Sequence, residues 1–347
     1  MVTDVEFAVV GAGMAGTATA RALARRGREV VLYEQFRIGH RRGSSHGASR
    51  IFRFSYDDPA YVRMAMAALP LWRELEQELD RTLIETTGGF DAGRRLDEHV
   101  AALASCGARY EVITGREAAE RFPVLRLAED EPALFQPDAG IARADDAVRS
   151  FADSARAHGA EIREEVPVTA LRLSGEKVEL IVADGTVRPR VVVVTAGAWA
   201  RGLLSPIGIE LPVTPTRETV AYFALTDGVV PSLVDWREPV FYALADPGRG
   251  VKAGLHHAGP VTDPSEEGEV SAAAVATLAT RVSERFPTAD PHPTGAETCI
   301  YTSTVDEHFV IERRGPVVVG SACSGHGFKF APLTGQRLAV LALEEAG

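Results

Sequence analysis

The sequence predicts an α/β protein in which a Rossmann-like nucleotide-binding domain is joined to a second domain built on an antiparallel sheet (α+β). Three observations support this prediction. The turn GAGMAG at residues 11–16 follows a short apolar run and precedes a segment rich in alanine and leucine. Residues 191–195 (VVVVT) are typical of a strand that is buried on both faces of a parallel sheet. Residues 212–304 are rich in strand patterns and contain one helical segment near 271–285.

The elements of the first domain occur at the start, the middle and the end of the chain. A helix is expected at 14–24, ended by Gly27, between strands at 5–10 and 29–34. Thr114 and Glu117 form a capping box, which marks the start of another helix. The further expected elements are helices at 60–79, 145–158 and 333–345, strands at 160–163, 169–173, 178–182, 191–195 and 317–320, and a hairpin turn at 184–185. We therefore expect a discontinuous cofactor domain formed by residues 1–85, 138–211 and 305–347, and a substrate domain formed by 86–137 and 212–304.

Composition excludes several classes of partner. The chain has 347 residues and a formal net charge of −11, which argues against nucleic acid. Its longest apolar runs are far shorter than the ~20 residues that a membrane helix needs, and the N-terminus has no basic leader. We expect a cytoplasmic protein with no membrane contact. Cys106, Cys299 and Cys323 lie far apart without a CxxC pair, so neither a disulfide framework nor a metal site is expected.

The glycine-rich turn is a dinucleotide-binding motif. Gly11 permits a tight turn, Gly13 lets the backbone approach a pyrophosphate, and Gly16 lets helix and strand pack closely. The helix N-terminus carries a partial positive charge toward the phosphates. Glu34, at the end of the second strand, can accept hydrogen bonds from ribose hydroxyls and would repel a 2′-phosphate. The motif predicts FAD or NAD without separating them, with contacts from Gly11, Ala12, Gly13, Met14, Ala15, Gly16 and Glu34.

Three longer segments favour the flavin. They are GSSHGASRIFR at 43–53, CIYTSTVDEHF at 299–309 and SGHGFKF at 324–330. Over nearly its whole length the chain resembles the monomeric sarcosine oxidase and N-methyltryptophan oxidase family, within the D-amino-acid-oxidase-like flavoproteins. The resemblance implies an FAD-binding Rossmann-like domain and a flavoenzyme that oxidises the C–N bond of a small amine.

The resemblance also implies which residues contact the cofactor. Cys299 matches the cysteine that carries FAD through a thioether at the flavin 8α carbon. His46 and Arg50 match residues beside the flavin ring, where fixed positive charge stabilises the anion formed on reduction. The segment TAGAW at 195–199 resembles one that approaches FAD from the middle of the chain. The contacts implied beyond the glycine motif are Gly43, Ser44, His46, Arg50, Ala196, Gly197, Trp199, Cys299, Gly325, Gly327, Phe328 and Lys329.

Substrate and oxygen residues follow from the same resemblance. Arg53 and Lys329 match the pair that holds the substrate carboxylate, a suitable combination of planar fork and compact charge. Lys252, in GVKAGLH at 250–256, matches the lysine that activates O₂. The catalytic set is therefore Lys252, Arg50 and His46, and the further residues implied at the substrate are His256, Tyr242, Tyr301 and Gly325.

The expected reaction is oxidation of an N-methyl or secondary amino acid by O₂, which yields an imine and H₂O₂. The partners implied are a small anionic amine and O₂, and the expected assembly is a monomer. The nearest alternative is oxidation of a cyclic imino acid such as pipecolate, which the motifs do not distinguish. An NAD-linked dehydrogenase would share only the glycine motif, and an FAD-binding protein without catalysis would have no need of Arg53, Lys329 and Lys252.

Overall fold

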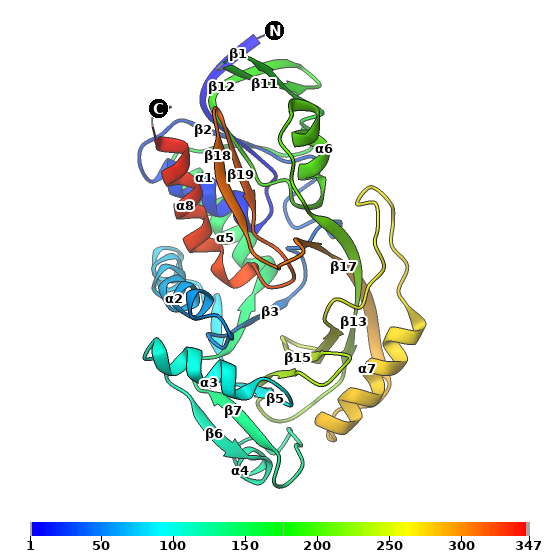
Figure 1. Cartoon of the computed structure of the whole chain (residues 1–347). Coiled ribbons are helices and arrows are strands. Elements are labelled where there is room, and N and C mark those ends of the chain that lie inside the picture. The colour runs from blue at the N-terminus through cyan, green and yellow to red at the C-terminus, as the bar shows by residue number, and fades with distance from the viewer. Residues whose placement is uncertain (1, 176, 345–347) are drawn as a thin grey trace.

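The computed structural model of the chain describes residues 2–175 and 177–344. Within these residues the strands form two eight-stranded sheets and one small three-stranded sheet. Figure 1 shows the first sheet near both chain termini and the second at the opposite end of the molecule, with helices packed against each. The two large sheets correspond to the two parts that the sequence predicted. The exact domain boundaries stay a prediction.

The first sheet is built on parallel strands. Strand β1 (Val2–Val10) lies between β2 (Val30–Tyr33) and β12 (Gly185–Val194), and β12 also pairs in parallel with β19 (Val317–Ser321). The β-branched run at 191–194 is almost completely buried, as its composition predicted. The edges of this sheet are completed by β9 (Glu161–Arg163), β10 (Ala170–Ser174), β11 (Lys177–Val182) and β18 (Val310–Arg314).

Three helices from distant parts of the chain cover one side of this sheet. Helix α1 (Met14–Ala24) packs against both α5 (Ala144–Ala157) and α8 (Ala331–Leu343). Gly16 permits the close contact of α1 with β1, because an added Cβ there would collide with the carbonyl oxygen of Gly11. Helix α8 begins two residues earlier than the sequence predicted, at Ala331. Its predicted last residue, Glu345, lies outside the described residues.

The second sheet is mostly antiparallel and draws its strands from two separate segments. Its order is β17 (Pro293–Ser303), β13 (Thr214–Phe223), β16 (Gly250–Leu255), β15 (Phe241–Asp246), β14 (Ser232–Asp235), β5 (Gly89–Ala92), β7 (Pro132–Gln136) and β6 (Glu111–Thr114). Helix α7 (Ala272–Arg285) packs on one face through Leu278 and Val282. Because side chains alternate along a strand, every second residue of β13, β15, β16 and β17 points to the other face.

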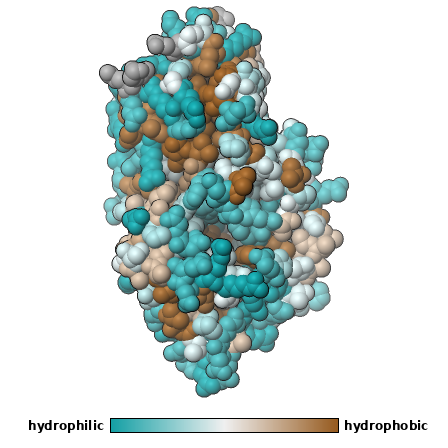
Figure 2. All heavy atoms as spheres, in the orientation of Figure 1, coloured by the Kyte–Doolittle hydropathy of each residue, from teal (hydrophilic) through white to brown (hydrophobic). Residues whose placement is uncertain are grey.

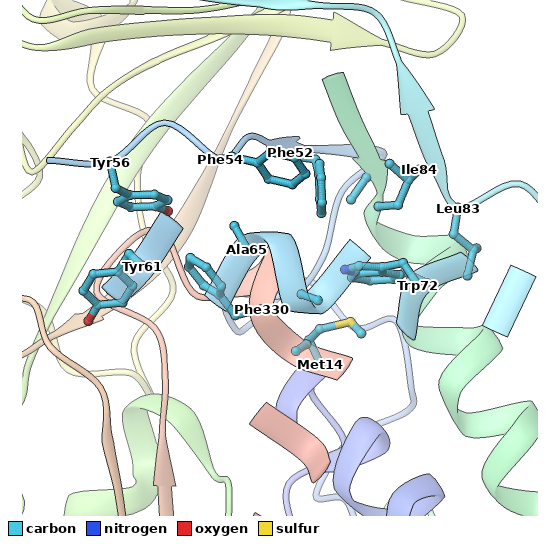
Figure 3. Packing of buried hydrophobic residues seen from close by; sticks show 14 of the residues in the cluster. Met14, Phe52, Phe54, Tyr56, Tyr61, Ala65, Trp72, Leu83, Ile84 and Phe330 are labelled. Atoms are coloured by element: carbon cyan, nitrogen blue, oxygen red, sulfur yellow. The ribbon is translucent and has the colours of Figure 1, made fainter. Parts of the chain in front are cut away.

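A small sheet and a long helix lie between the two large sheets. The small sheet contains β3 (Ser49–Phe52), β8 (Gly140–Arg143) and β4 (Ile84–Thr86). Helix α2 (Pro59–Leu79) carries Trp72 into the apolar cluster of Figure 3, which also contains Phe52, Leu83 and Phe330. Trp72 is fully buried, and its indole Nε1 donates to the carbonyl oxygen of Lys329 at 2.8 Å. The core therefore fixes the backbone of a predicted site residue.

The remaining helices agree with local sequence signals. Thr114 and Glu117 form the expected capping box at the start of α4 (Gly115–Arg121). Helix α3 (Leu96–Ser105) lies within residues 86–137, the first segment of the expected substrate domain. Hydrophilic residues cover much of the face shown in Figure 2, with apolar patches between them. None of the helices in the described part of the chain is both long and apolar enough to span a bilayer.

Candidate active site

A cavity of about 1580 Å³ extends from the first sheet to the free face of the second. Every site residue predicted from the sequence lines this cavity, with the exception of Gly16. Gly16 lies behind the wall, at the contact between β1 and α1, which is the packing role that the glycine motif predicted for it. One continuous space therefore brings together residues that are up to about 300 positions apart in the chain.

The end of the cavity at the first sheet is formed by the glycine motif and by Glu34. The N-cap of α1 is Gly13, which has no side chain to cap the helix. The amide of Met14 donates to Ser45 Oγ at 3.1 Å, and this first turn lines the cavity with the positive end of the helix dipole. The buried carboxylate of Glu34 accepts hydrogen bonds from the backbone amides of Ala12, at 2.7 Å, and Phe36, at 2.9 Å. An added Cβ at Gly13 would lie 3.2 Å from Ser45 Oγ, so the space between the glycine motif and Ser45 is narrow.

The loop at 43–50 brings a histidine and an arginine into the middle of the cavity. His46 is only 4 % exposed, and among the described residues neither of its ring nitrogens has a hydrogen-bond partner. Arg50 donates from Nη2 to the carbonyl oxygens of Ser44 and His46, and from Nη1 to that of Ser49. Arg50 therefore shapes the loop as well as supplying charge.

The surroundings of His46 affect its ionisation. Burial, followed by the charge of Arg50, lowers the pKa of His46 to about 4. His46 is therefore neutral at neutral pH in the chain as described, and the fixed positive charge expected from the pair rests on Arg50. A neutral imidazole still offers one donor and one acceptor to a polar ligand.

The far end of the cavity contains the predicted carboxylate anchors. Arg53 Nη1 forms an ion pair with Asp91 at 2.5 Å, and Asp91 also accepts a hydrogen bond from Trp236 Nε1 at 2.9 Å. The guanidinium carbon lies 5.0 Å from the ring centre of Tyr56 and 5.4 Å from that of Trp236. Lys329 Nζ donates to Tyr56 Oη at 2.7 Å. Arg53 is thus already paired with a buried carboxylate, a contact that the sequence analysis did not predict.

Lys329 is strongly affected by its surroundings. It is 5 % exposed, and burial together with the charge of Arg53 holds its pKa well below the usual range. Its ammonium group also donates to the carbonyl oxygen of His326 at 2.9 Å. An anionic ligand beside Lys329 would favour the charged form of the lysine, so ligand binding and proton uptake are linked at this position.

Histidine and tyrosine side chains form the wall near the second sheet. Tyr242 and Tyr301 pack with Cys299 on its free face. His256 and His257 both face Glu307, with Nε2–carboxylate distances of 3.9 and 3.3 Å. These three side chains place their ligand atoms within 4.8 Å of one another, a spacing that a metal ion can use and that the sequence analysis did not predict.

Gly325 is placed where a side chain would not fit. A Cβ added to it would lie 2.5 Å from Tyr301 Cε2 and 3.0 Å from His256 Cε1. The segment at 324–327 therefore approaches the wall closely.

Lys252 projects from the middle of the same sheet face. It is 4 % exposed, and its Nζ donates to the carbonyl oxygen of Ser49 at 3.3 Å. Burial, with the charge of Arg50 next, lowers the pKa of Lys252 to about 8. An amine with this pKa carries its proton at neutral pH and can stabilise negative charge that develops beside it.

The comparisons with known proteins agree with this geometry. Residues 6–341 match the family described as DAO, FAD dependent oxidoreductase. The chain belongs to this family. It is 33% identical to a monomeric sarcosine oxidase of Streptomyces avermitilis, over 96% of this chain and 92% of that protein, and 33% identical to the peroxisomal sarcosine oxidase of Homo sapiens, over 97% and 91%. The structure of NikD, an amino acid oxidase essential for nikkomycin biosynthesis, superimposes with a TM-score of 0.90 at 27% identity, over 99% of this chain and 95% of NikD.

Membership of the FAD dependent oxidoreductase family confirms the predicted fold class and cofactor, and its relatives support an oxidoreductase acting on CH–NH groups. The cavity fits FAD on three observations. The first turn of α1 lines it with the positive end of the helix dipole, the glycines of the motif leave room for a close approach, and the buried ring nitrogens of His46 lack partners among the described residues. Each is a polar or spatial feature that a bound dinucleotide would satisfy.

The surroundings of Cys299 do not make its thiol acidic. Cys299 lies on β17, is 7 % exposed and lines the cavity. Burial raises the pKa of its thiol, while the charges of Arg50 and Lys252 act in the opposite direction. Cys323 also lines the cavity, and its sulfur accepts a hydrogen bond from the backbone amide of Thr302.

Several residues in or beside the cavity wall were missed by the sequence analysis. Glu297 lies two positions before Cys299 and four before Tyr301, so the two-residue period of a strand would have placed all three on one face. Asp91 and Trp236 come from segments without a recognisable motif, and their contact with Arg53 depends on the pairing of β5 with β14. The sequence therefore contained a signal for Glu297 but none for the other two.

Proposed function

We propose that the protein is an FAD-dependent oxidase of small, anionic secondary amines, with O₂ as the electron acceptor. The observation that carries this proposal is the arrangement of three cations in one cavity. Arg53 and Lys329 lie at the far end, where Tyr56 contacts both, and Lys252 lies on the sheet face beside Cys299. The sarcosine oxidases named above support the assignment of substrate class.

The chain's own residues would hold the cofactor as the family resemblance implied. The amides at the start of α1 would bind the pyrophosphate, and Glu34 would lie at the ribose. Cys299 would form the thioether link, and His46 and Arg50 would lie against the ring. FAD, when bound, supplies an acceptor for two electrons from the amine and a donor of two electrons to O₂.

Substrate binding in this proposal depends on Arg53 and Lys329. The substrate carboxylate would accept hydrogen bonds from Arg53 and from the ammonium of Lys329, which fixes the amine toward the face that carries Tyr242 and Tyr301. The amine must be neutral to lose hydride, so the rate of amine oxidation should rise with pH as the bound amine deprotonates. The imine product hydrolyses in water, or stays cyclic if the substrate was a ring.

Lys252 would serve the oxygen half of the reaction. Reduction of O₂ develops negative charge, which a buried ammonium group stabilises in a site of low dielectric constant. The product would be H₂O₂. We also propose that the protein acts as a monomer, because the Streptomyces relative is a monomeric sarcosine oxidase.

A cyclic imino acid is the second candidate substrate. The aromatic rings of Tyr56 and Trp236 flank Arg53 and offer an apolar surface to the ring carbons of a substrate held by its carboxylate. The likeness to NikD, described as an unusual amino acid oxidase, also favours this candidate.

Oxygen consumption and peroxide release test the proposal. Purified holoenzyme is mixed with sarcosine, proline or pipecolate, and O₂ loss is followed with an electrode while H₂O₂ is assayed. The proposal predicts equal amounts of O₂ consumed and H₂O₂ formed with at least one of these amines. A reaction that proceeds only with added NAD⁺, or that leaves O₂ unchanged with every amine, would contradict it.

A further inference from the structure

Glu297 is a carboxylate on the free face of the second sheet that the proposed function does not use. On β17 it shares this face with Cys299 and Tyr301, because side chains alternate along the strand. In the neighbouring strand β13, Tyr222 pairs with Lys252 of β16. The hydroxyl of Tyr222 donates a hydrogen bond to Glu297 Oε1. Tyr222 therefore links the strand that carries Glu297 to the strand that carries Lys252.

Glu297, Lys252 and Arg50 surround one small space beside Gly47. The position that a Cβ of Gly47 would occupy lies 3.3 Å from Arg50 Nη1, 3.4 Å from Lys252 Nζ and 3.7 Å from Glu297 Oε1. Gly47 has a φ of +101°, and its amide donates to Asp145 Oδ1 at 2.8 Å, so the loop is held in this conformation. Two basic side chains and one acidic side chain thus meet at a point that no side chain fills.

The titratable groups around Lys252 come from three strands and one loop, and an aromatic ring comes from a fourth strand. Arg50 lies on β3, Asp246 on β15, and Glu297 and Cys299 on β17, while His46 lies in the loop at 43–50. The ring of Tyr222 on β13 completes the set, with its centre 5.8 Å from Lys252 Nζ. Arg50 disfavours the charged amine, and the two carboxylates favour it.

The two carboxylates differ in how strongly other groups neutralise them. Asp246 forms an ion pair with Arg249 at 2.6 Å and accepts a hydrogen bond from Ser49 Oγ at 2.9 Å. Glu297 accepts its hydrogen bond from the neutral hydroxyl of Tyr222. The guanidinium of Arg41 is 3.7 Å away from Glu297, but its side chain is 82% exposed, so solvent screens this pair. Both carboxylates raise the pKa of Lys252, Asp246 more than Glu297. Glu297 is the one of the two whose arginine partner is largely exposed and screened by solvent.

We propose that Glu297 is a positioning residue that keeps Lys252 protonated at the oxygen-reacting face of the cavity. The proposal rests on the role given to Lys252 in the proposed function. A buried ammonium beside Arg50 is unfavourable, and an ionised carboxylate bordering the same small space offsets this cost. Burial favours the neutral acid of Glu297, but the hydrogen bond from Tyr222 and the charge of Lys252 outweigh it and lower the pKa of Glu297. The carboxylate is therefore ionised over the whole pH range in which Lys252 gains or loses its proton.

The first test is the pH profile of flavin reoxidation in Glu297→Gln. The glutamine keeps the shape of the side chain and removes its charge. Lys252 is charged below its pKa, so the second-order rate constant with O₂ should fall as pH rises through that pKa, in wild type near pH 8. The variant should move this midpoint down by about one pH unit, which lowers the rate constant about fivefold at pH 8 and leaves it unchanged near pH 6. Glu297→Asp should restore most of the wild-type profile.

The second test reads Lys252 without using activity. Holoenzyme is treated with a trace of acetic anhydride over a series of pH values, and acetylation of Lys252 is measured by peptide mass spectrometry. Only the neutral amine reacts, so the midpoint of labelling reports the ionisation of Lys252. It should lie about one unit lower in Glu297→Gln than in wild type. Glu312→Gln, a charge removed from the distant strand β18, should leave this midpoint unchanged.

The outcomes separate this inference from the proposed function. If Lys252→Met leaves reoxidation unchanged, the role proposed for Lys252 is wrong, whereas the labelling midpoints still report whether Glu297 controls its charge. If Lys252→Met slows reoxidation but Glu297→Gln has wild-type midpoints in both tests, the role of Glu297 is overturned. Should Glu297→Gln fail to retain flavin, Glu297→Ser serves in its place, with the same downward shift expected and the same unshifted result overturning the proposal.

Discussion

Replacement of Arg53 by methionine should weaken the binding of a carboxylate-bearing amine by about two orders of magnitude. In the structure Arg53 Nη1 is held by Asp91, and among the described residues Nε and Nη2 donate to no other group. These two donors are available to a substrate carboxylate. A hydrogen bond to a charged group contributes about 1.5 kcal/mol or more, so two contribute about 3 kcal/mol, which corresponds to a factor of about 100 in Kd.

Asp91 provides a matched control for this substitution. In Arg53→Met its buried carboxylate keeps only the hydrogen bond from Trp236, and it would repel the carboxylate of the substrate. The double variant Arg53→Met/Asp91→Asn removes that repulsion. It should bind the substrate about three- to tenfold more tightly than the single variant, though still more weakly than wild type.

Anaerobic stopped-flow reduction measures both effects. The rate of flavin bleaching is recorded against substrate concentration, which separates the apparent Kd from the limiting rate. The methyl ester of the same amine lacks the charged carboxylate and should bind Arg53→Met and wild type within about threefold of each other. Equal loss of affinity for the acid and its ester, or a change of less than about fivefold for the acid, would refute the role assigned to Arg53.

Three further substitutions follow from the site. Lys252→Met should slow reoxidation by O₂ by at least about 100-fold, while the rate of anaerobic reduction changes less than about threefold. Double-mixing kinetics measures both rates, and equal losses in the two half-reactions would contradict the role of Lys252. Cys299→Ser should bind FAD that acid precipitation releases into the supernatant, whereas wild type should retain it in the pellet; flavin release from wild type would rule out the thioether. Gly16→Val should lower the free energy of unfolding by about 1–3 kcal/mol or more, because the valine side chain would collide with Gly11. Urea denaturation measures this loss, and a stability equal to wild type would show that α1 does not contact the turn after β1 at this position.

Local sequence signals were sufficient for most of the fold. The glycine motif predicted β1, α1 and β2 because each glycine has a separate steric reason, and the β-branched run at 191–194 predicted a strand buried in a parallel sheet. The capping box at Thr114 predicted the start of α4 for an equally local reason. Helix ends were less certain, since α8 begins at Ala331, where the tertiary contact of the preceding turn with Trp72 decides the boundary.

Charge states and long-range pairings could not be predicted in this way. The sequence placed His46 and Arg50 in one loop, but whether His46 carries a proton depends on its burial by distant elements. The pairing of Arg53 with Asp91 depends on two strands that the sequence does not align. Lys252 was recognised from a resemblance. Its proximity to Glu297 could not be predicted, because it depends on β16 and β17 both pairing with β13.

The most direct test of the proposed activity is the visible spectrum of the purified protein during anaerobic addition of sarcosine, proline and pipecolate. The proposed function predicts a yellow protein whose flavin band bleaches with at least one of these amines and returns when O₂ is admitted. A yellow protein that none of the three bleaches would contradict oxidation of small secondary amines. A colourless protein that does not take up FAD would contradict the cofactor on which the whole assignment depends.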